Sequence, residues 1–220
     1  MHNELVIRDL VIKVIHNKRL KHSYINVLPS GEIIVKTPVK SSSYIHKLID
    51  NRYDWITQKL AYIKQYEKID INLEDEVLIF GEVYSIDHHI AEPLRKKLER
   101  LKMPNETNVL ACYDRYYKES AKMHIPDRVE YFSALMNLKP SGIRYRKMRR
   151  RWGSCDSKKE LTFNINLLKL PYELIDYVIV HELAHIKHMN HSKQFHELVR
   201  NYLPDAKKLE RQIREHFYRL

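Results

Sequence analysis

The segment YVIVHELAHIKHMNHSKQF, residues 177–195, constrains the fold more than any other part of the chain. His181 and His185 are four residues apart, so on a helix their side chains lie one turn apart on the same face. The residues before and between them are mostly apolar, which predicts a helix with a buried rear face. Two imidazoles on the front face of such a helix can reach one metal ion, and H-E-x-x-H is the spacing found in zinc hydrolases.

This spacing rarely arises by chance. In a chain of 220 residues with 13 histidines, random placement produces H-E-x-x-H about 0.06 times, and about 0.003 times with a further histidine six residues on. The histidines are therefore interpreted as a metal site rather than as incidental residues of a packing helix.

A catalytic zinc ion takes three protein ligands and keeps one open position. His188 and His191 are the candidates for the third ligand. Seven residues of straight helix rise about 10.5 Å, so His188 lies too far from His181 for three rings to close easily on one ion. A break near Asn190 would let the chain fold back over the metal and bring His191 to it, with Ser192 as the cap of the next helix. We therefore predict one zinc ion per chain, held by His181, His185 and His191, with His188 outside the ligand set.

The residue beside the first histidine predicts the chemistry. Glu182 can reach a water molecule on the ion without being a ligand itself. Zinc lowers the pKa of bound water from 15.7 to about 7, and a neighbouring carboxylate can take the proton. Glu182 is thus the expected general base, a role worth typically about 10²–10⁴ in rate. The attacked group could be a peptide carbonyl, another acyl group or a phosphoryl group.

The rest of the chain reads as an α+β fold. Branched residues alternate in the first forty positions, which predicts a small antiparallel sheet, and a long helix with Ser41–Ser43 as caps follows. Further elements are expected as a hairpin with a Gly81-Glu82 turn, helices at 94–102, 106–122 and 126–137, strands at 141–148 and 161–165, and helices from 172 and 192. We expect an N-terminal β-rich module over residues 1–92 and a metal-binding domain over residues 93–220.

Composition limits the possible functions. The net charge of +11 favours anionic partners such as nucleotides or nucleic acid, although a solvated basic face would have the same charge. The four glycines are too far apart for a P-loop or a dinucleotide-binding fingerprint. Phosphate binding by a glycine-rich cradle is therefore excluded.

The expected compartment is the cytoplasm. No apolar run of 18 residues is present, so no membrane span is expected, and the start MHNELVIRDL lacks the layout of a secretory signal. In a reducing compartment, Cys112 and Cys155 are expected to be free thiols.

Three segments occur in an order that resembles a known family. RWGSC at residues 151–155, LTFNINLLKLP at 161–171 and the histidine segment are similar to the YgjP-like metallopeptidases, relatives of the SprT-like and other zincin-fold proteases. The N-terminal strands, DWI and FGEVYSI also fit, so the resemblance spans nearly the whole chain. It implies a zincin-like core, the same three histidine ligands, and Glu182 as the base.

The resemblance leaves the substrate open. His188 occupies the position where the longer zincin motif places a turn glycine, which agrees with the YgjP-like pattern and argues against the metzincin class. Most family members are described as metallopeptidases, whereas members close to the YgjP type carry an assignment as nucleoside-triphosphate pyrophosphatases acting on UTP. We expect a metallopeptidase-like hydrolase first, acting on a peptide or protein, and a UTP pyrophosphatase with the same metal site as the alternative.

Residues near the histidine helix have candidate supporting roles. Arg151 could hold an anionic group or a developing oxyanion, or pair with an internal carboxylate. Trp152 is expected to shape the wall above the metal or to anchor the loop, and Cys155 to pack as a small core residue. Asn164 is expected to fix the loop or a ligand histidine.

The segment RYRKMRRR, residues 144–151, places six cationic side chains in eight positions just before the site. As one strand, it would put Arg144, Arg146 and Arg150 on one face and the remaining cations on the other. Such a segment could steer a phosphate-rich substrate or nucleic acid to the site, or be merely solvated. The oligomeric state is not predicted.

Overall fold

The structure is a computed structural model that describes residues 3–28, 30–66 and 68–219. It forms two compact units, one of Met1–Ile69 with Glu215–Leu220 and one of Asp70–Arg214. The chain thus divides after Ile69 and not after residue 92, because the predicted hairpin belongs to the second unit. The α+β class is confirmed.

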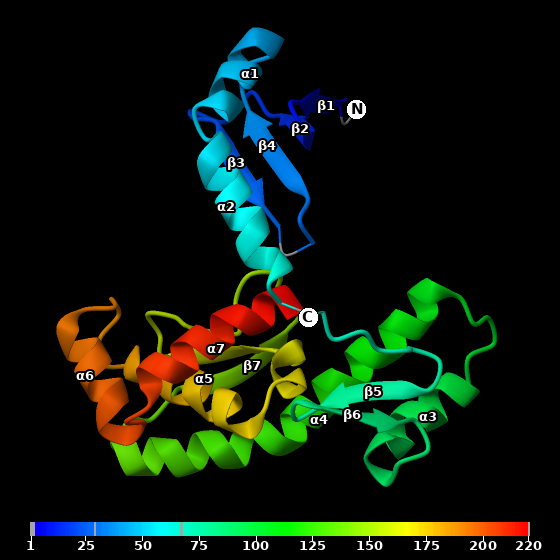
Figure 1. Ribbon diagram of the computed structural model, residues 1–220. Coiled ribbons are helices and arrows are strands. Elements are labelled where there is room, and N and C mark those ends of the chain that lie inside the picture. The colour runs from blue at the N-terminus through cyan, green and yellow to red at the C-terminus, as the bar shows by residue number, and fades with distance from the viewer. Residues whose placement is uncertain (1–2, 29, 67, 220) are drawn as a thin grey trace. The chain divides into compact units, whose positions relative to one another are not determined.

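The first unit contains a four-stranded sheet in the order β1-β2-β4-β3 (Figure 1). Its strands are β1 (Asn3–Ile7), β2 (Leu10–His16), β3 (Tyr24–Val27) and β4 (Ile33–Thr37). Two pairings are antiparallel, as the sequence predicts, but β2 and β4 are parallel. The difference arises because β4 pairs between β2 and β3 rather than at the edge of the sheet.

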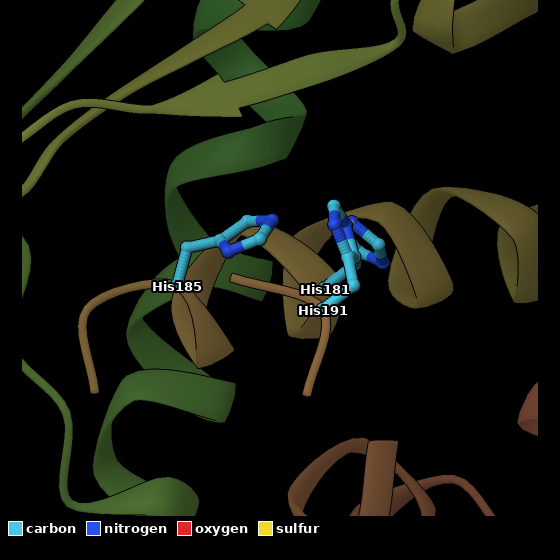
Figure 2. A group of neighbouring side chains, drawn as sticks. All are labelled: His181, His185 and His191. Carbon is cyan, nitrogen blue, oxygen red and sulfur yellow. The ribbon is translucent and has the colours of Figure 1, made fainter. Parts of the chain in front are cut away.

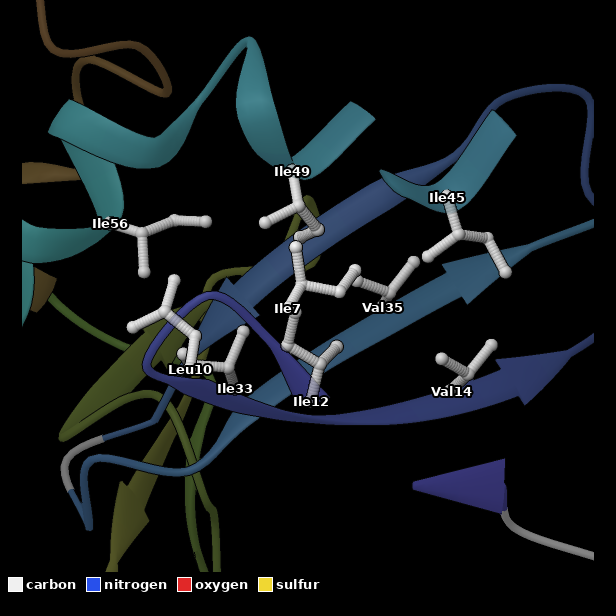
Figure 3. Close-up of a cluster of buried hydrophobic side chains, with 9 residues drawn as sticks. All are labelled: Ile7, Leu10, Ile12, Val14, Ile33, Val35, Ile45, Ile49 and Ile56. Carbon is white, nitrogen blue, oxygen red and sulfur yellow. The ribbon is translucent and has the colours of Figure 1, made fainter. Parts of the chain in front are cut away.

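Two helices cover one face of this sheet, where the sequence predicts one long helix. They are α1 (Ser42–Asp50) and α2 (Tyr53–Lys64). Ser41 caps α1 by accepting a hydrogen bond from the Tyr44 N–H, as expected. The helix ends at Asn51, and the Arg52 N–H donates to the Ile49 carbonyl in a tighter turn. The core between helices and sheet is aliphatic, and its central side chains are drawn in Figure 3.

The second unit begins with the hairpin of β5 (Glu76–Ile79) and β6 (Glu82–Ser85). Its turn is Phe80-Gly81, one residue earlier than predicted. Both residues have positive φ, 54° and 85°, as a type I′ turn requires. A Cβ on Gly81 would lie 2.7 Å from the Pro171 ring. The Phe80 ring stacks on Tyr172 with centroids 4.2 Å apart. The hairpin turn therefore packs against the segment that begins helix α5.

After the 3-10 turn η1 (His89–Ala91) and helix α3 (Glu92–Glu99), α4 (Glu106–Met136) runs for 31 residues. The sequence predicts two helices here, at 106–122 and 126–137, but α4 is continuous through both ranges, including Pro126. α4 buries Tyr113 and Tyr117, whose hydroxyls donate to the carbonyls of Glu76 and Leu78. This helix therefore holds the hairpin and also packs on α5.

A small sheet in the order β7-β9-β8 leads to the site. It consists of β7 (Gly142–Arg146), β8 (Gly153–Cys155) and β9 (Glu160–Asn164), with β7 parallel and β8 antiparallel to β9. Strand geometry ends at Arg146, so the basic segment does not alternate as one strand. β8 was predicted as part of a loop. It forms because its three residues pair with β9 across a tight turn at Asp156–Lys159.

The chain ends with the turn η2 (Ile165–Lys169) and the helices α5 (Tyr172–Ala184), α6 (Lys193–Tyr202) and α7 (Ala206–Arg219). Leu174, Ile175, Ile179 and Leu183 are buried on the rear of α5, as the sequence predicts. Among the described residues, no helix is both long and apolar enough to span a membrane. Cys112 and Cys155 are free thiols.

Candidate metal centre

Helix α5 and the turn after it bring three imidazoles together (Figure 2). His181 lies in the last turn of α5 and His185 is its C-cap residue. The helix therefore ends earlier than the break expected near Asn190, with the His188 N–H donating to the Ala184 carbonyl. His191 immediately precedes Ser192, which caps α6 as predicted.

The three rings have a spacing that suits one small cation. One nitrogen of each of His181, His185 and His191 lies within 4.8 Å of the others. The Nε2 atoms of His181 and His191 are 3.1 Å apart. Two imidazole ligands on a tetrahedral zinc ion, each about 2.0–2.1 Å from it, have nitrogens roughly 3.3 Å apart. The donor set and its spacing therefore fit zinc, and small ring rotations would complete the fit.

His188 contributes its backbone and not its ring. The Nδ1–H of His185 donates to the His188 carbonyl at 3.0 Å. This bond fixes the tautomer of His185 and leaves Nε2 with its lone pair toward the other two rings.

The Phe195 ring contacts all three imidazoles. Its ring centroid lies 4.9 Å from that of His181, 4.6 Å from that of His185 and 4.8 Å from that of His191. Burial, followed by the other two rings, lowers the pKa of His181 to about 3. The His181 ring is thus held neutral, which is the form that binds metal. The sequence gives one signal for Phe195, its place three residues after the Ser192 cap.

Glu182 lies beside this cluster in a poorly solvated position. It is 6% exposed, and burial raises its pKa to about 8 although Arg151 acts to lower it. Within the described part of the chain, its carboxylate accepts no hydrogen bond. The Glu182 carboxylate is therefore not held by a structural hydrogen bond. Its raised pKa lies near neutral pH, which suits a group that accepts and returns a proton.

These residues open on a cleft of about 480 Å³. Strand β8 and the turn of His191 line it together with α5 and part of α7. Tyr177, Glu210, Ile213 and Arg214 also line it and were not singled out by the sequence. Tyr177 is one turn before His181, so the helical period could have indicated it. The residues of α7 lie too far away in the sequence to carry such a signal.

Comparison with known proteins agrees with this arrangement. The family model described as YgjP-like, metallopeptidase domain, matches residues 21–216. The chain belongs to the YgjP-like family. It is therefore a member of a metallopeptidase family, a metal-dependent and peptidase-like hydrolase, and this membership implies a metal cofactor, typically zinc.

Two solved structures are similar to parts of this YgjP-like chain. The metallopeptidase zymogen of Pyrococcus abyssi abylysin is 25% identical, with a TM-score of 0.38, covering 40% of this chain and 90% of that one. The metallopeptidase zymogen of Methanocaldococcus jannaschii jannalysin is 30% identical, with a TM-score of 0.38, covering 42% of this chain and 95% of that one. A search of curated proteins returns no match.

Two of the remaining predicted site residues of the YgjP-like domain line the cleft, and Asn164 does not. Arg151 is exposed and Trp152 is 7% exposed, and both line the cleft. Asn164 lies behind the loop rather than against a histidine. Its Nδ2 donates to the carbonyls of Met148 and Arg151, at 2.7 and 2.8 Å. Asn164 thus fixes the loop, which is one of its two expected roles.

Proposed function

We propose that this YgjP-like chain is a zinc peptidase with Glu182 as its general base. The observation that carries the proposal is an uncommitted, buried carboxylate that lies against the edge strand β8 and follows one of three converging imidazoles in the sequence. Structural metal sites are closed by a fourth protein ligand. Here the described residues offer three imidazoles and an open cleft, as a catalytic site requires.

The residues of the chain divide the work as follows. A zinc ion held by His181, His185 and His191 supplies Lewis acidity when bound. Glu182 accepts the proton of the attacking water and passes it to the departing amine. Its side chain is only 6% exposed, which keeps competing water away.

Strand β8 provides a place for an extended peptide. The Asn164 N–H donates to the Trp152 carbonyl, and the Asp156 N–H donates to the Glu160 carbonyl. In an antiparallel ladder, bonded and non-bonded pairs alternate, so Gly153 and Cys155 point their N–H and C=O groups away from β9. A substrate strand can add to this edge through main-chain hydrogen bonds.

The test uses the full chain loaded with zinc and a peptide library read by mass spectrometry. We expect cleavage that requires zinc and disappears in the Glu182→Gln variant, prepared in parallel to exclude a contaminating protease. Cleavage that persists in Glu182→Gln at the wild-type rate would remove the proposal.

A second candidate is hydrolysis of UTP to UMP and pyrophosphate at the same site. Arg151 favours it, because this cleft residue forms no ion pair among the described residues, whereas Arg214 pairs with Glu210 at 3.4 Å. A guanidinium at the cleft rim can bind phosphate oxygens in two places at once. The same preparation is therefore also assayed for zinc-dependent release of pyrophosphate from UTP, which without any peptide cleavage would replace the first candidate by the second.

A further inference from the structure

Strand β8 lies very close to helix α5 at Gly153. An ideal Cβ built on Gly153 would lie 2.7 Å from Cγ of Glu182, 2.7 Å from its Oε1 and 2.9 Å from its Cδ. Carbon atoms in proteins do not pack at such distances, since the contact optimum is about 3.5–4.0 Å. Gly153 lacks the positive φ of Gly31 and Gly81. The glycine is therefore required by space and not by backbone conformation.

Neither side of this contact can move away easily. Gly153 pairs with Phe163 in β9, and the Phe163 side chain is fully buried. The neighbouring Trp152 carbonyl accepts a hydrogen bond from the Asn164 N–H at 2.8 Å. On the other side, α5 is anchored by apolar residues such as Ile179 and Leu183, which are fully buried. Strand and helix thus set a fixed gap, and the Glu182 side chain fills it.

We propose that Gly153 is the positioning residue for Glu182. The bare backbone of β8 forms the surface against which the Glu182 side chain lies, and this contact sets the direction of the carboxylate oxygens relative to the three imidazoles. Any side chain at position 153 displaces the carboxylate. The catalytic part of this inference rests on the proposed role of Glu182 as the base.

Gly153 also lies next to both the proposed base and the proposed peptide-binding edge of β8. Gly153 turns its Cα toward Glu182 and its N–H and C=O toward the free edge of β8, where a peptide would bind. A substrate strand and the base are therefore located from the same backbone unit. Misplacement of a catalytic group by about 1 Å can lower a rate about 10²-fold, so even the methyl group of alanine should matter here.

The first test compares Gly153→Ala with Gly142→Ala, the same change at the first residue of β7, where the nearest atom to an added Cβ is Oε1 of Glu160 at 3.4 Å. In the zinc-loaded full chain, we expect Gly153→Ala to keep its zinc and to lower kcat about 10²-fold, with KM changed by less than about threefold. Gly142→Ala should stay within about twofold of wild type. Equal rates for Gly153→Ala and wild type would overturn the inference.

A double-variant cycle identifies the route of the effect. If Gly153 acts through Glu182, Gly153→Ala lowers turnover in the wild-type background but adds no further loss to Glu182→Gln. An equal loss in both backgrounds would mean general damage to the cleft and would reject the positioning role. Full activity of Glu182→Gln alone is a different result, because it would reject the base and not the contact.

An exchange of side-chain size between positions 153 and 182 tests the contact without a measurement of turnover. Glu182→Asp withdraws the carboxylate by one methylene and makes room for a methyl group at position 153. We expect Gly153→Ala to lower the thermal midpoint of the metal-free protein, and addition of Glu182→Asp to restore it. If Gly153→Ala alone does not fold, the double variant should fold. Independence of the two changes in thermal unfolding would overturn the inference.

Discussion

The Nδ1–H of His185 donates to the main-chain carbonyl of His188 at 3.0 Å. The turn that ends α5 therefore orients one of the three predicted ligands, and it does so through the backbone. The imidazole of His188 takes no part in this contact. Position 188 thus supports the cluster whatever its side chain, while position 191 supplies a ring to it.

This relationship predicts different zinc contents for two histidine variants. His191→Ala removes one of three converging nitrogens and should lose most of the bound zinc. His188→Ala keeps the carbonyl that orients His185 and should retain about one zinc per chain. Elemental analysis after dialysis against a weak chelator measures both. Greater loss in His188→Ala would show that the third ligand is wrongly assigned.

Replacement of the base separates metal binding from turnover. Glu182→Gln keeps the size of the side chain and all three imidazoles, so zinc content should stay at the wild-type level. Turnover should fall by about 10² or more, because the proton acceptor is gone. Loss of zinc in this variant would instead identify Glu182 as a ligand. The measurement pairs single-turnover kinetics with elemental analysis of the same preparation.

Asn164 should be among the most sensitive polar residues of the fold. It is 2% exposed, and its side chain also accepts from the N–H groups of Met148 and Asn166. Asn164→Ala would leave several buried groups without partners and should lower the free energy of unfolding by about 3 kcal/mol in urea titration. Asn166→Ala removes a less buried amide two residues on and serves as the control, with a change under about 0.5 kcal/mol.

The thiol in the cleft should react slowly near neutral pH. Burial raises the pKa of Cys155 to about 11, and Glu182 and Asp156 act in the same direction. Only the thiolate is nucleophilic, so alkylation of the metal-free Cys112→Ser variant by iodoacetamide at pH 8 should be about 10²-fold slower than that of a free cysteine. The rate should rise about tenfold per pH unit toward pH 11. A plateau below pH 9 would contradict this prediction.

Arg149 and Arg150 of the basic segment should distinguish the two candidate substrates. If a peptide binds along β8, its binding depends on main-chain hydrogen bonds, so Arg149→Gln with Arg150→Gln should leave cleavage of a neutral peptide within about twofold. If UTP is the substrate, the same double change should raise its KM and weaken the salt dependence of KM. Arg95→Gln with Lys96→Gln removes equal charge from α3 and is the control. Equal effects of both pairs would mean that only net charge matters.

The ends of several helices followed from local chemistry. Ser41 and Ser192 were predicted as caps and accept the expected backbone hydrogen bonds, because capping depends on residues three positions away. Local rules failed at α4. Its continuity through Pro126 depends on side chains packed along the helix, such as Ile125 and Val129, and on the loss of only one N–H.

The residues of the candidate site also fall into two groups, those that the local sequence indicates and those that only the tertiary structure brings to the site. His181 and His185 could be placed together because four residues of helix separate them, and His191 because the chain turns soon afterwards. Only the tertiary structure shows which other residues lie at the site, namely Phe195, Tyr177 and the cleft residues of α7. β8 was missed because Gly-Ser-Cys has no strand pattern of its own, and only its pairing with β9 defines it.

The two ends of α5 share a feature that bears on how the site fills with metal. At its start, Gly81 lies so close to Pro171 that a Cβ would be 2.7 Å from the proline ring, and near its end Gly153 meets Glu182 at the same distance. Two such contacts hold α5 closely against the hairpin turn at one end and against β8 at the other. His181 and its C-cap neighbour His185 are therefore positioned by packing outside the metal site, and we expect them to need little rearrangement when an ion binds.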